Sequence, residues 1–292
     1  MKKKNICFII NPISGGGKQK NTEALIKRKL DVSQFVYNIF YTEALGHAAE
    51  LSKKAVNLAY DVVVAVGGDG SVNEVAQGLI NSHVALAVLP TGSGNGFARH
   101  LNIPLNIEEA IELINCFNIK KIDTATVNEK LFLNIAGVGF DAHVGWKFSQ
   151  SKKRGFTSYI KIVIKEFYKY IPKNYKIDIA GKTISRKAFL ISFANGSQYG
   201  NNAFIAPQAL MDDSLIDICI LKKFPLTAVP GLVYKLFKKR LHASKFVEVI
   251  RCSSFTIYQE DSEIIHVDGE PLKGGKILQV KINPLSLNVI AP

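Results

Sequence analysis

The sequence predicts an α/β protein with two domains, an N-terminal doubly wound parallel sheet and a C-terminal antiparallel β-sandwich. In the first part of the chain, short apolar runs alternate with amphipathic segments, as in a parallel sheet covered by helices. After about Asp123, short strand-like segments separated by turn residues dominate, which is typical of an antiparallel sandwich. We therefore expect one domain over residues 1–123 and a second over 124–292, whose final segment can return to the first domain.

The composition supports a folded protein with a substantial core. The chain has 292 residues, of which 47% are hydrophobic and 21% charged. Its four cysteines are scattered without a CxxC pair, which argues against a metal or disulfide framework and favours a reducing cytoplasm. The apolar run after the N-terminal lysines is too short for a signal peptide, and no run of about 18 apolar residues predicts a membrane span.

Each element is predicted from its hydrophobic pattern. The expected strands of the first domain are 5–10, 35–41, 62–66 and 84–89, with another beginning at 120. Helices are expected after the loop at 11–18, from about 43 to 57, from 71 to 80 and from 107 to 116. In the second domain we expect strands at 124–127, 131–135, 176–179, 188–193, 215–221, 246–250, 254–258 and 277–282. Two helices should interrupt them, at 156–170 and 226–241.

Three glycine-rich loops follow strands of the first domain. The most distinctive is Gly67–Gly70, which comes directly after five apolar residues and is followed by Ser71, a residue suited to cap a helix. A strand, a glycine loop and a helix together present backbone N–H groups to a phosphate. The carboxylate of Asp69 would repel a bare anion, so it fits better with a divalent cation or a specific hydrogen-bonding role.

The other two loops occupy residues 11–18 and 90–98. The first is not a Walker A loop, because Pro12 stands where the first glycine should be and Gln19 where serine or threonine should be. Because all three loops follow parallel strands, we expect them to meet at the carboxyl edge of the sheet, where such folds bind ligands.

The positive charge is concentrated in the second half. The formal net charge is +13; residues 146–187 carry +10 and residues 222–251 carry +7, so the rest of the chain carries about −4. Such a surface suits nucleic acid or an anionic membrane, but the chain has no helix-turn-helix, zinc-finger or RNA-binding signature, so no nucleic-acid partner is expected. The lysines accompany apolar stripes in the helices expected at 156–170 and 226–241, and these stripes suit either membrane docking or the domain core.

From their local sequence alone, two carboxylates have ordinary explanations. Glu270 follows Asp268-Gly269, a dipeptide typical of a hairpin turn, and Asp213 lies in a turn-like sequence. The six histidines have no metal-ligand spacing and are interpreted as structural, with His100 alone near a glycine loop.

Several motifs together resemble the diacylglycerol kinase catalytic-domain family, which includes bacterial lipid kinases and sphingosine and ceramide kinases. The motifs are Asn-Pro-Ile-Ser-Gly-Gly (11–16), Gly-Gly-Asp-Gly-Ser-Val-Asn-Glu-Val (67–75), Leu-Pro-Thr-Gly-Ser-Gly-Asn-Gly-Phe-Ala-Arg (89–99), Leu-Asn-Ile-Ala-Gly-Val-Gly-Phe-Asp-Ala (133–142), Ala-Pro-Gln-Ala-Leu-Met-Asp-Asp-Ser-Leu-Ile-Asp (206–217) and Asp-Gly-Glu-Pro (268–271). The resemblance covers nearly the whole chain. It implies a nucleotide-binding α/β domain, a β-sandwich domain, ATP bound between them, and phosphoryl transfer to a lipid hydroxyl.

The resemblance also assigns roles to individual positions. Some positions of this chain, including three in the third loop, match nucleotide-contacting residues of the family. They are Asn11, Pro12, Ser14, Gly15, Thr42, Gly67, Gly68, Asp69, Gly70, Ser71, Asn73, Gly92, Ser93 and Asn95. Glu270 matches the general base of the family, and Asp69 and Asp123 match acidic positions near the reacting centre. Leu210, Asp213 and Leu215 match a Mg²⁺ site made from two backbone carbonyls and one carboxylate.

The chain departs from the family pattern at two positions. Gly96 stands where many bacterial diacylglycerol kinases have an aspartate, and Ser214 replaces the glycine usual after Asp213. The first departure bears on the identity of the lipid acceptor, since Gly92–Asn95 resembles the loop of sphingosine kinases. The second bears on the Mg²⁺ site.

The sequence therefore predicts an ATP- and Mg²⁺-dependent lipid kinase that phosphorylates a lipid alcohol, either diacylglycerol or a sphingoid base or related lipid. It should act as a cytoplasmic protein bound peripherally to an anionic membrane surface, and strand edges of its second domain could pair into a homodimer. Two alternatives remain, a soluble-substrate kinase of the NAD kinase type and a non-catalytic lipid- or nucleotide-binding regulator.

Overall fold

The computed structural model describes residues 2–14, 21–151, 156–261 and 263–292. The chain divides into two compact units. Unit 1 comprises Met1–Asp123 together with Pro284–Pro292, and unit 2 comprises Thr124–Asn283. Each unit has its own core and is described separately.

Unit 1 contains the predicted parallel sheet. Its strands are β1 (Lys4–Ile10), β2 (Phe35–Tyr41), β3 (Val62–Gly67), β4 (Ala85–Pro90) and the end of β15 (Ile277–Ile290). They lie in the order β15-β4-β3-β1-β2, and all neighbouring strands are parallel. Every residue of β3 and β4 is buried, because both faces of the central strands are covered by helices.

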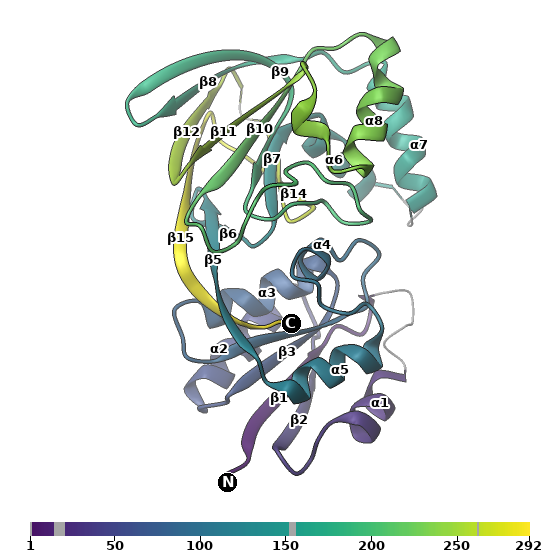
Figure 1. Cartoon of the computed structure of the whole chain (residues 1–292), viewed down its shortest axis with the longest axis vertical. Helices are drawn as coiled ribbons and strands as arrows, with labels where there is room; N and C mark the ends of the chain where they lie inside the picture. Colours follow the sequence, from purple (N-terminus) through teal and green to yellow (C-terminus); the bar gives the residue numbers. More distant parts are fainter. Residues whose placement is uncertain (1, 15–20, 152–155, 262) are drawn as a thin grey trace. The chain divides into compact units, whose positions relative to one another are not determined.

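The helices of unit 1 are α1 (Thr22–Lys29), α2 (His47–Asn57), α3 (Asp69–Leu79), α4 (Gly96–His100) and α5 (Ile107–Cys116). Helices α1 and α5 pack together over one set of strand side chains, and α2 packs against α3 (Figure 1). The doubly wound fold predicted from the sequence is thereby confirmed. One local expectation was wrong, since α3 begins at Asp69 with Gly68 as its N-cap, so that Ser71 lies within the helix.

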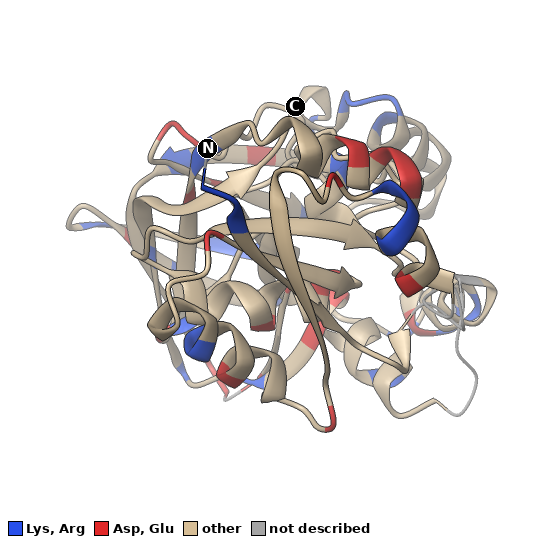
Figure 2. Cartoon of the chain, turned by 90° about the horizontal axis from the view of Figure 1, so that it is seen from below, with Lys and Arg blue, Asp and Glu red and all other residues tan. Residues whose placement is uncertain are grey.

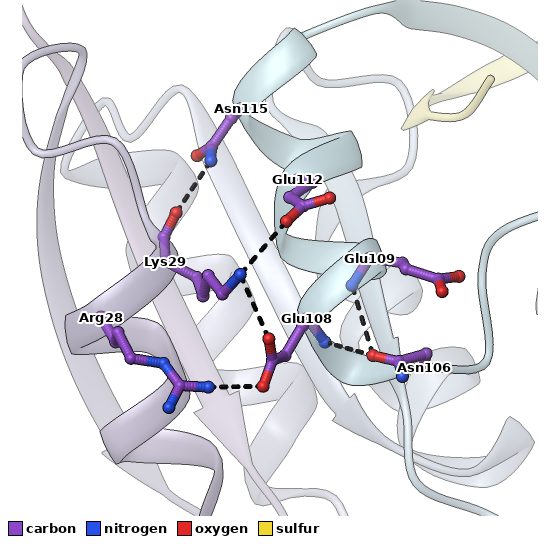
Figure 3. Close-up of polar contacts among 7 residues, drawn as sticks. All are labelled: Arg28, Lys29, Asn106, Glu108, Glu109, Glu112 and Asn115. Carbon is purple, nitrogen blue, oxygen red and sulfur yellow. Dashed lines mark hydrogen bonds and ion pairs between the residues drawn. The ribbon is translucent and has the colours of Figure 1, made fainter.

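Charged side chains link α1 to α5 at the surface. Figure 3 shows Arg28 and Lys29 paired with Glu108, and Lys29 Nζ also lies 3.4 Å from Glu112. The Asn115 amide donates to the Lys29 carbonyl at 2.9 Å. In Figure 2 a helix end coloured blue for Lys and Arg lies beside a helix with red segments for Asp and Glu, which agrees with the pairing of α1 with α5. Because the pairs are exposed, they contribute little stability compared with the apolar contacts beneath them.

Unit 2 is built from antiparallel strands, as predicted. They are β5 (Ile119–Val127), which begins in unit 1, β6 (Lys130–Phe132), β7 (Ile135–Gly139), β8 (Lys173–Ile179), β9 (Lys182–Ala194), β10 (Ile216–Lys222), β11 (Val247–Cys252), β12 (Ser254–Gln259), β13 (Ile264–Val267), β14 (Glu270–Lys273) and the first part of β15. The main path of this unit is β14-β13-β7-β9-β8-β12-β15, with β10 between β9 and β11. Apolar side chains from most of these strands form one core.

The expectation of a single strand at 131–135 was wrong, because the chain forms two strands there, β6 and β7. The reason lies in the backbone N–H groups of Leu133, Asn134 and Ile135. All three donate to the carboxylate of Asp268, at 2.8, 2.9 and 3.0 Å. These donors are thus satisfied by a side chain, and the strand is interrupted.

The helices of unit 2 are α6 (Phe140–Ser149), α7 (Phe156–Phe167) and α8 (Val229–Phe237), with short 3₁₀ turns at Leu226–Ala228 and Leu241–Ala243. In Figure 1 the three helices lie near one another, and all three contribute side chains to a second apolar cluster rich in aromatic residues. Helix α6 was not predicted from the sequence. The helix predicted at 226–241 was too long, because Lys239 adopts a positive φ of 58° that ends the helical backbone. Within the described residues, no helix is long and apolar enough to cross a membrane.

Candidate functional site

The three predicted loops are joined by hydrogen bonds at the carboxyl edge of the unit 1 sheet. Asn11, directly after β1, donates from its amide to Ser71 Oγ on α3 at 3.1 Å. Ser14 Oγ lies 3.1 Å from Thr91 Oγ1, at the end of β4. The Thr91 backbone N–H in turn donates to the Gly67 carbonyl at 2.9 Å. The first loop therefore contacts both of the others, as the parallel strand arrangement predicts.

Glycines allow the second and third loops to approach closely. A Cβ built on Gly92 would lie 2.6 Å from Gly68 Cα and 2.7 Å from Asn95 Oδ1. A Cβ on Gly67 would lie 2.4 Å from the Ser71 side chain. All three distances are shorter than an ordinary carbon contact. A side chain at Gly92 would therefore push the second and third loops apart, and one at Gly67 would displace the Ser71 side chain. We refer to these three hydrogen-bonded loops as the cradle; a glycine-rich loop that leads into a helix is suited to phosphate groups.

Asp69 connects the second loop to the third. Its two carboxylate oxygens accept the backbone N–H groups of Gly96 and Phe97, each at 3.1 Å. These are the first two residues of α4, so the carboxylate satisfies donors at a helix start. The question that the sequence raised about Asp69 thus has a structural answer: the carboxylate holds the third loop against the second.

Asn95 places a polar atom inside this group of loops. The residue is 8% exposed and has a positive φ of 51°. Its amide nitrogen donates to the Gly92 carbonyl at 2.9 Å, while Oδ1 has no hydrogen-bond partner among the described residues. A buried acceptor of this kind suits a ligand with hydroxyl or amino donors, such as a nucleoside.

The remaining nucleotide positions predicted from the sequence lie around these loops. Pro12 and Ser93 are exposed, and the Thr42 backbone N–H donates to the Ile10 carbonyl at 2.9 Å. Gly70 and Asn73 lie on α3. Gly15 lies outside the described residues.

In unit 2, Glu270 lies at the start of β14, just after a two-residue turn. Asp268 and Gly269 have φ angles of 47° and 87°, as a type I′ hairpin turn requires. Glu270 is exposed and pairs in the ladder with Val267. The hairpin expected from the local sequence is therefore present, and it presents the Glu270 side chain at the surface of unit 2.

Asp123 occupies a different environment from the other predicted carboxylates. It is fully buried in unit 1, and its Oδ1 accepts the backbone N–H of Leu285 at 2.7 Å. This bond ties β5 to the segment that leads into the end of β15. The geometry favours a supporting role for this carboxylate rather than contact with a substrate.

The predicted Mg²⁺ position lies in a tight turn. Asp213 Oδ1 accepts the Leu215 backbone N–H at 3.0 Å, and Ser214 between them has a φ of 61°. Glycine adopts this conformation without strain, in keeping with the glycine that the family resemblance leads us to expect at this position. The described residues contain no group of three or more histidine, cysteine or acidic side chains that could hold a metal ion, so an ion here would depend on Asp213 and on the carbonyls of Leu210 and Leu215.

A buried polar cluster in unit 2 was missed by the sequence analysis. Asp141 Oδ2 accepts hydrogen bonds from Tyr199 Oη at 2.9 Å, His266 Nε2 at 3.1 Å and Ser192 Oγ at 3.3 Å. Burial raises the pKa of Tyr199 well above its usual value, so its phenol is a neutral donor. Asp141 and His266 are 125 residues apart, and no spacing rule could connect them.

Comparison with known proteins identifies the family. Residues 5–127 match the family of the diacylglycerol kinase catalytic domain. Residues 134–291 match the YegS C-terminal NAD kinase beta sandwich-like domain. The chain belongs to the diacylglycerol kinase catalytic-domain family. It is therefore a kinase, and membership of this kinase family implies the use of ATP.

Relatives in the family match this chain over most of its length. A Pseudomonas aeruginosa PAO1 protein named "Probable lipid kinase YegS-like" is 32% identical over 85% of this chain and 82% of its own length. A "Diacylglycerol kinase" of Staphylococcus saprophyticus is 28% identical over 94% of this chain and 91% of its own. The solved structure of a diacylglycerol kinase from Bacillus anthracis str. Sterne superposes with a TM-score of 0.77, covering 100% of this chain and 98% of that one at 24% identity, and so shares the fold.

Proposed function

We propose that the protein is an ATP- and Mg²⁺-dependent lipid kinase that transfers the γ-phosphoryl group of ATP to a lipid hydroxyl. The observation that carries the proposal is the glycine cradle of unit 1, in which three strand-end loops are fixed to one another by hydrogen bonds. Phosphoryl transfer needs alignment and charge neutralisation more than covalent help from the protein. Under this proposal unit 1 is the nucleotide-binding domain and unit 2 the lipid-substrate domain.

The cradle fits ATP in two respects. A side chain at Gly92 would push apart the second and third loops, whose close approach shapes the cradle, and a glycine-rich loop that leads into a helix suits phosphate groups. The buried Oδ1 of Asn95 supplies an acceptor for a hydroxyl or amino donor of the nucleoside. Asp69 acts by holding the third loop in place, since both of its oxygens accept N–H groups of α4.

Glu270 is the proposed general base. It takes the proton from the lipid hydroxyl as that oxygen attacks the γ-phosphorus, a role that suits an exposed carboxylate held on a rigid hairpin. Mg²⁺, when bound, neutralises charge on the phosphates. A second, structural ion would be held by the Asp213 carboxylate and the carbonyls of Leu210 and Leu215.

Membrane docking is assigned to an exposed apolar and basic surface on α7 and α8. Residues that face inward from these helices, such as Val163 and Leu232, pack into the aromatic cluster. Other apolar residues of the same region are exposed: Ile164 56%, Tyr168 72%, Ile171 74%, Tyr234 59% and Phe237 46%. Exposed basic residues alternate with them: Lys161, Lys165, Lys169, Lys238, Lys239 and Arg240. The sequence left open whether these stripes face the domain core or a membrane; the inward-facing residues belong to the core, and we propose membrane docking for the exposed ones.

This surface supports peripheral binding to an anionic membrane, because each basic residue near such a surface contributes about 1 kcal/mol. Replacing Lys161 and Lys165 together by glutamate should weaken binding to phosphatidylglycerol vesicles by more than roughly tenfold at low salt. Lys130→Glu, on the distant strand β6, is the control. Binding that is independent of salt would contradict the electrostatic part of the proposal. A homodimer through a strand edge of unit 2 remains a prediction.

The decisive experiment identifies the acceptor. The protein is incubated with γ-labelled ATP, Mg²⁺, NAD and a total lipid extract, and the label should appear in an organic-soluble product. Label on NAD would favour the soluble-substrate alternative, and no label anywhere would favour a non-catalytic regulator. Glu270→Gln should lower kcat by roughly 10²- to 10⁴-fold with the fold intact, whereas Glu260→Gln, an exposed glutamate of the same unit, should be neutral.

A further inference from the structure

We infer that His266 and Asp141 form a buried positioning pair that fixes the hairpin carrying Glu270, an inference that rests on the proposed role of Glu270. Neither residue lies in the nucleotide cradle of unit 1. The sheet, helix α6 and the hairpin meet at these two side chains.

One position of the sheet lacks a side chain, and the carboxylate of Asp141 occupies the space above it. Ser192 on β9, Gly137 on β7 and His266 on β13 are direct neighbours across three strands. Gly137 has no side chain, and a Cβ there would lie 3.0 Å from both Asp141 Oδ2 and His266 Nε2. Glycine at this one position therefore lets the carboxylate from α6 enter between the flanking side chains of Ser192 and His266.

The bond between the pair is buried and directional. The side chains of His266 and Asp141 are 5% and 11% exposed. A carboxylate oxygen only accepts, so His266 Nε2 carries the proton of the 3.1 Å bond. Low exposure strengthens this interaction and makes its loss costly, since removal of the imidazole would leave a buried carboxylate with fewer donors.

His266 lies in β13, the strand that leads directly into the Asp268-Gly269 turn before Glu270. In the β13–β14 hairpin it pairs with Pro271, next to the pair formed by Val267 and Glu270. Asp268 fixes the tip of this hairpin through three backbone N–H groups of the β6–β7 connection. His266 supplies a second attachment, to helix α6. The ladder between β13 and β7 holds the backbone of the hairpin, and the two side-chain attachments add to it in defining the direction of the Glu270 side chain.

The effect on catalysis follows from geometry. A displacement of about 1 Å at a reacting group can cost on the order of 100-fold in rate. Removing the second attachment should therefore lower kcat while leaving the nucleotide cradle, and with it the KM for ATP, unchanged. A purely structural histidine would instead change stability without changing kcat per folded molecule.

The test compares His266→Leu, which removes the donor, with His266→Gln, which keeps an N–H donor on a side chain of similar reach. Kinase activity is measured with ATP and detergent-dispersed lipid extract, together with thermal unfolding. We expect His266→Leu to lower kcat by roughly 10- to 100-fold with the KM for ATP within about twofold, and His266→Gln to recover most of the activity. His83→Leu, at an exposed histidine of unit 1, is the matched control.

Hydrogen exchange of the backbone amides of residues 264–273 separates this inference from the proposed function. His266→Leu should accelerate exchange in the hairpin whether or not the wild-type protein phosphorylates a lipid. Unchanged exchange, or unchanged kcat in an active enzyme, would overturn the inference. If the wild-type protein is inactive but the hairpin loosens in the variant, the lipid kinase proposal fails while the attachment through His266 stands.

Discussion

Substitution of Gly92 by alanine tests the nucleotide cradle with a single added methyl group. In the structure that methyl carbon would lie 2.6 Å from Gly68 Cα and 2.7 Å from Asn95 Oδ1. Ordinary carbon contacts begin near 3.4 Å, so the second and third loops must separate by about 0.8 Å. The neighbour on one side is backbone, which cannot rotate out of the way as a side chain could.

The expected magnitude follows from the cost of overpacking, which is about 1–3 kcal/mol for an added methyl in a well-packed site. Separation of the loops should also disturb the bonds from Asp69 to the start of α4, because these bonds join the same two loops. If most of the cost falls on the geometry that binds phosphate, Gly92→Ala should weaken ATP binding by roughly 5- to 150-fold.

The assay is direct titration of the folded protein with a fluorescent ATP analogue, supported by circular dichroism and thermal unfolding. The matched control is Gly231→Ala on α8, where an added Cβ would meet nothing within 4 Å. That substitution should leave the Kd unchanged and add about 0.5–1 kcal/mol of stability, because alanine is the better helix former. Wild-type affinity in Gly92→Ala would refute the reasoning, since the close loop approach would then be irrelevant to nucleotide binding.

Three further predictions concern unit 2. The Arg186 hydrogen bond, followed by that of Lys222, holds the pKa of Glu248 at about 2. Because the folded pKa is depressed, the stabilisation is complete above the unfolded value near 4.5 and is lost as pH falls toward 2. Glu248→Gln should therefore cost about 1–2 kcal/mol at pH 7, after allowance for partial exposure, and urea unfolding should show the difference shrinking below pH 4.5. Ser214→Gly should stabilise the turn by about 0.5–1 kcal/mol, because it relieves a left-handed serine; a lower melting temperature would show that the hydroxyl contributes more than the strain costs. Asp268→Asn keeps a residue that tolerates positive φ but replaces one acceptor oxygen with a donor, so denaturant unfolding should reveal a loss of about 1–3 kcal/mol; an unchanged midpoint would mean that the three N–H groups find other acceptors.

Unit 1 could be predicted from the sequence because its signals are local. The runs at 62–66 and 84–89 are long enough and apolar enough to require burial on both faces, and glycines mark the carboxyl end of each strand. Parallel topology then brings the loops together without further information. The register of the contacts, such as Ser14 with Thr91 across 77 residues, depends on tertiary packing and could not be predicted.

The part of unit 2 that carries Glu270 was harder to predict for physical reasons. Strands β13 and β14 have four residues each, which is too short for a periodic signal. Helix α6 follows directly on β7, and its buried residues, Phe140, Ala142 and Val144, do not form a helical stripe. These elements are held by side-chain to backbone bonds from Asp268 and by the Asp141–His266 pair, and neither kind of contact leaves a repeating pattern in the sequence.

The contacts of Gly96 show what glycine at this position changes in the cradle. Its N–H is one of the two donors that Asp69 accepts, and it is a buried residue at the start of α4. An acidic side chain at this position, as in many bacterial members of the family, would add a second negative charge close to Asp69. Glycine keeps the backbone bond and omits that charge, so the loop connection does not depend on the missing acid. The departure from the family pattern therefore changes the charge that a cation or a lipid acceptor would meet at the carboxyl edge of the unit 1 sheet. The hydrogen bonds from Asp69 that join the second and third loops are kept.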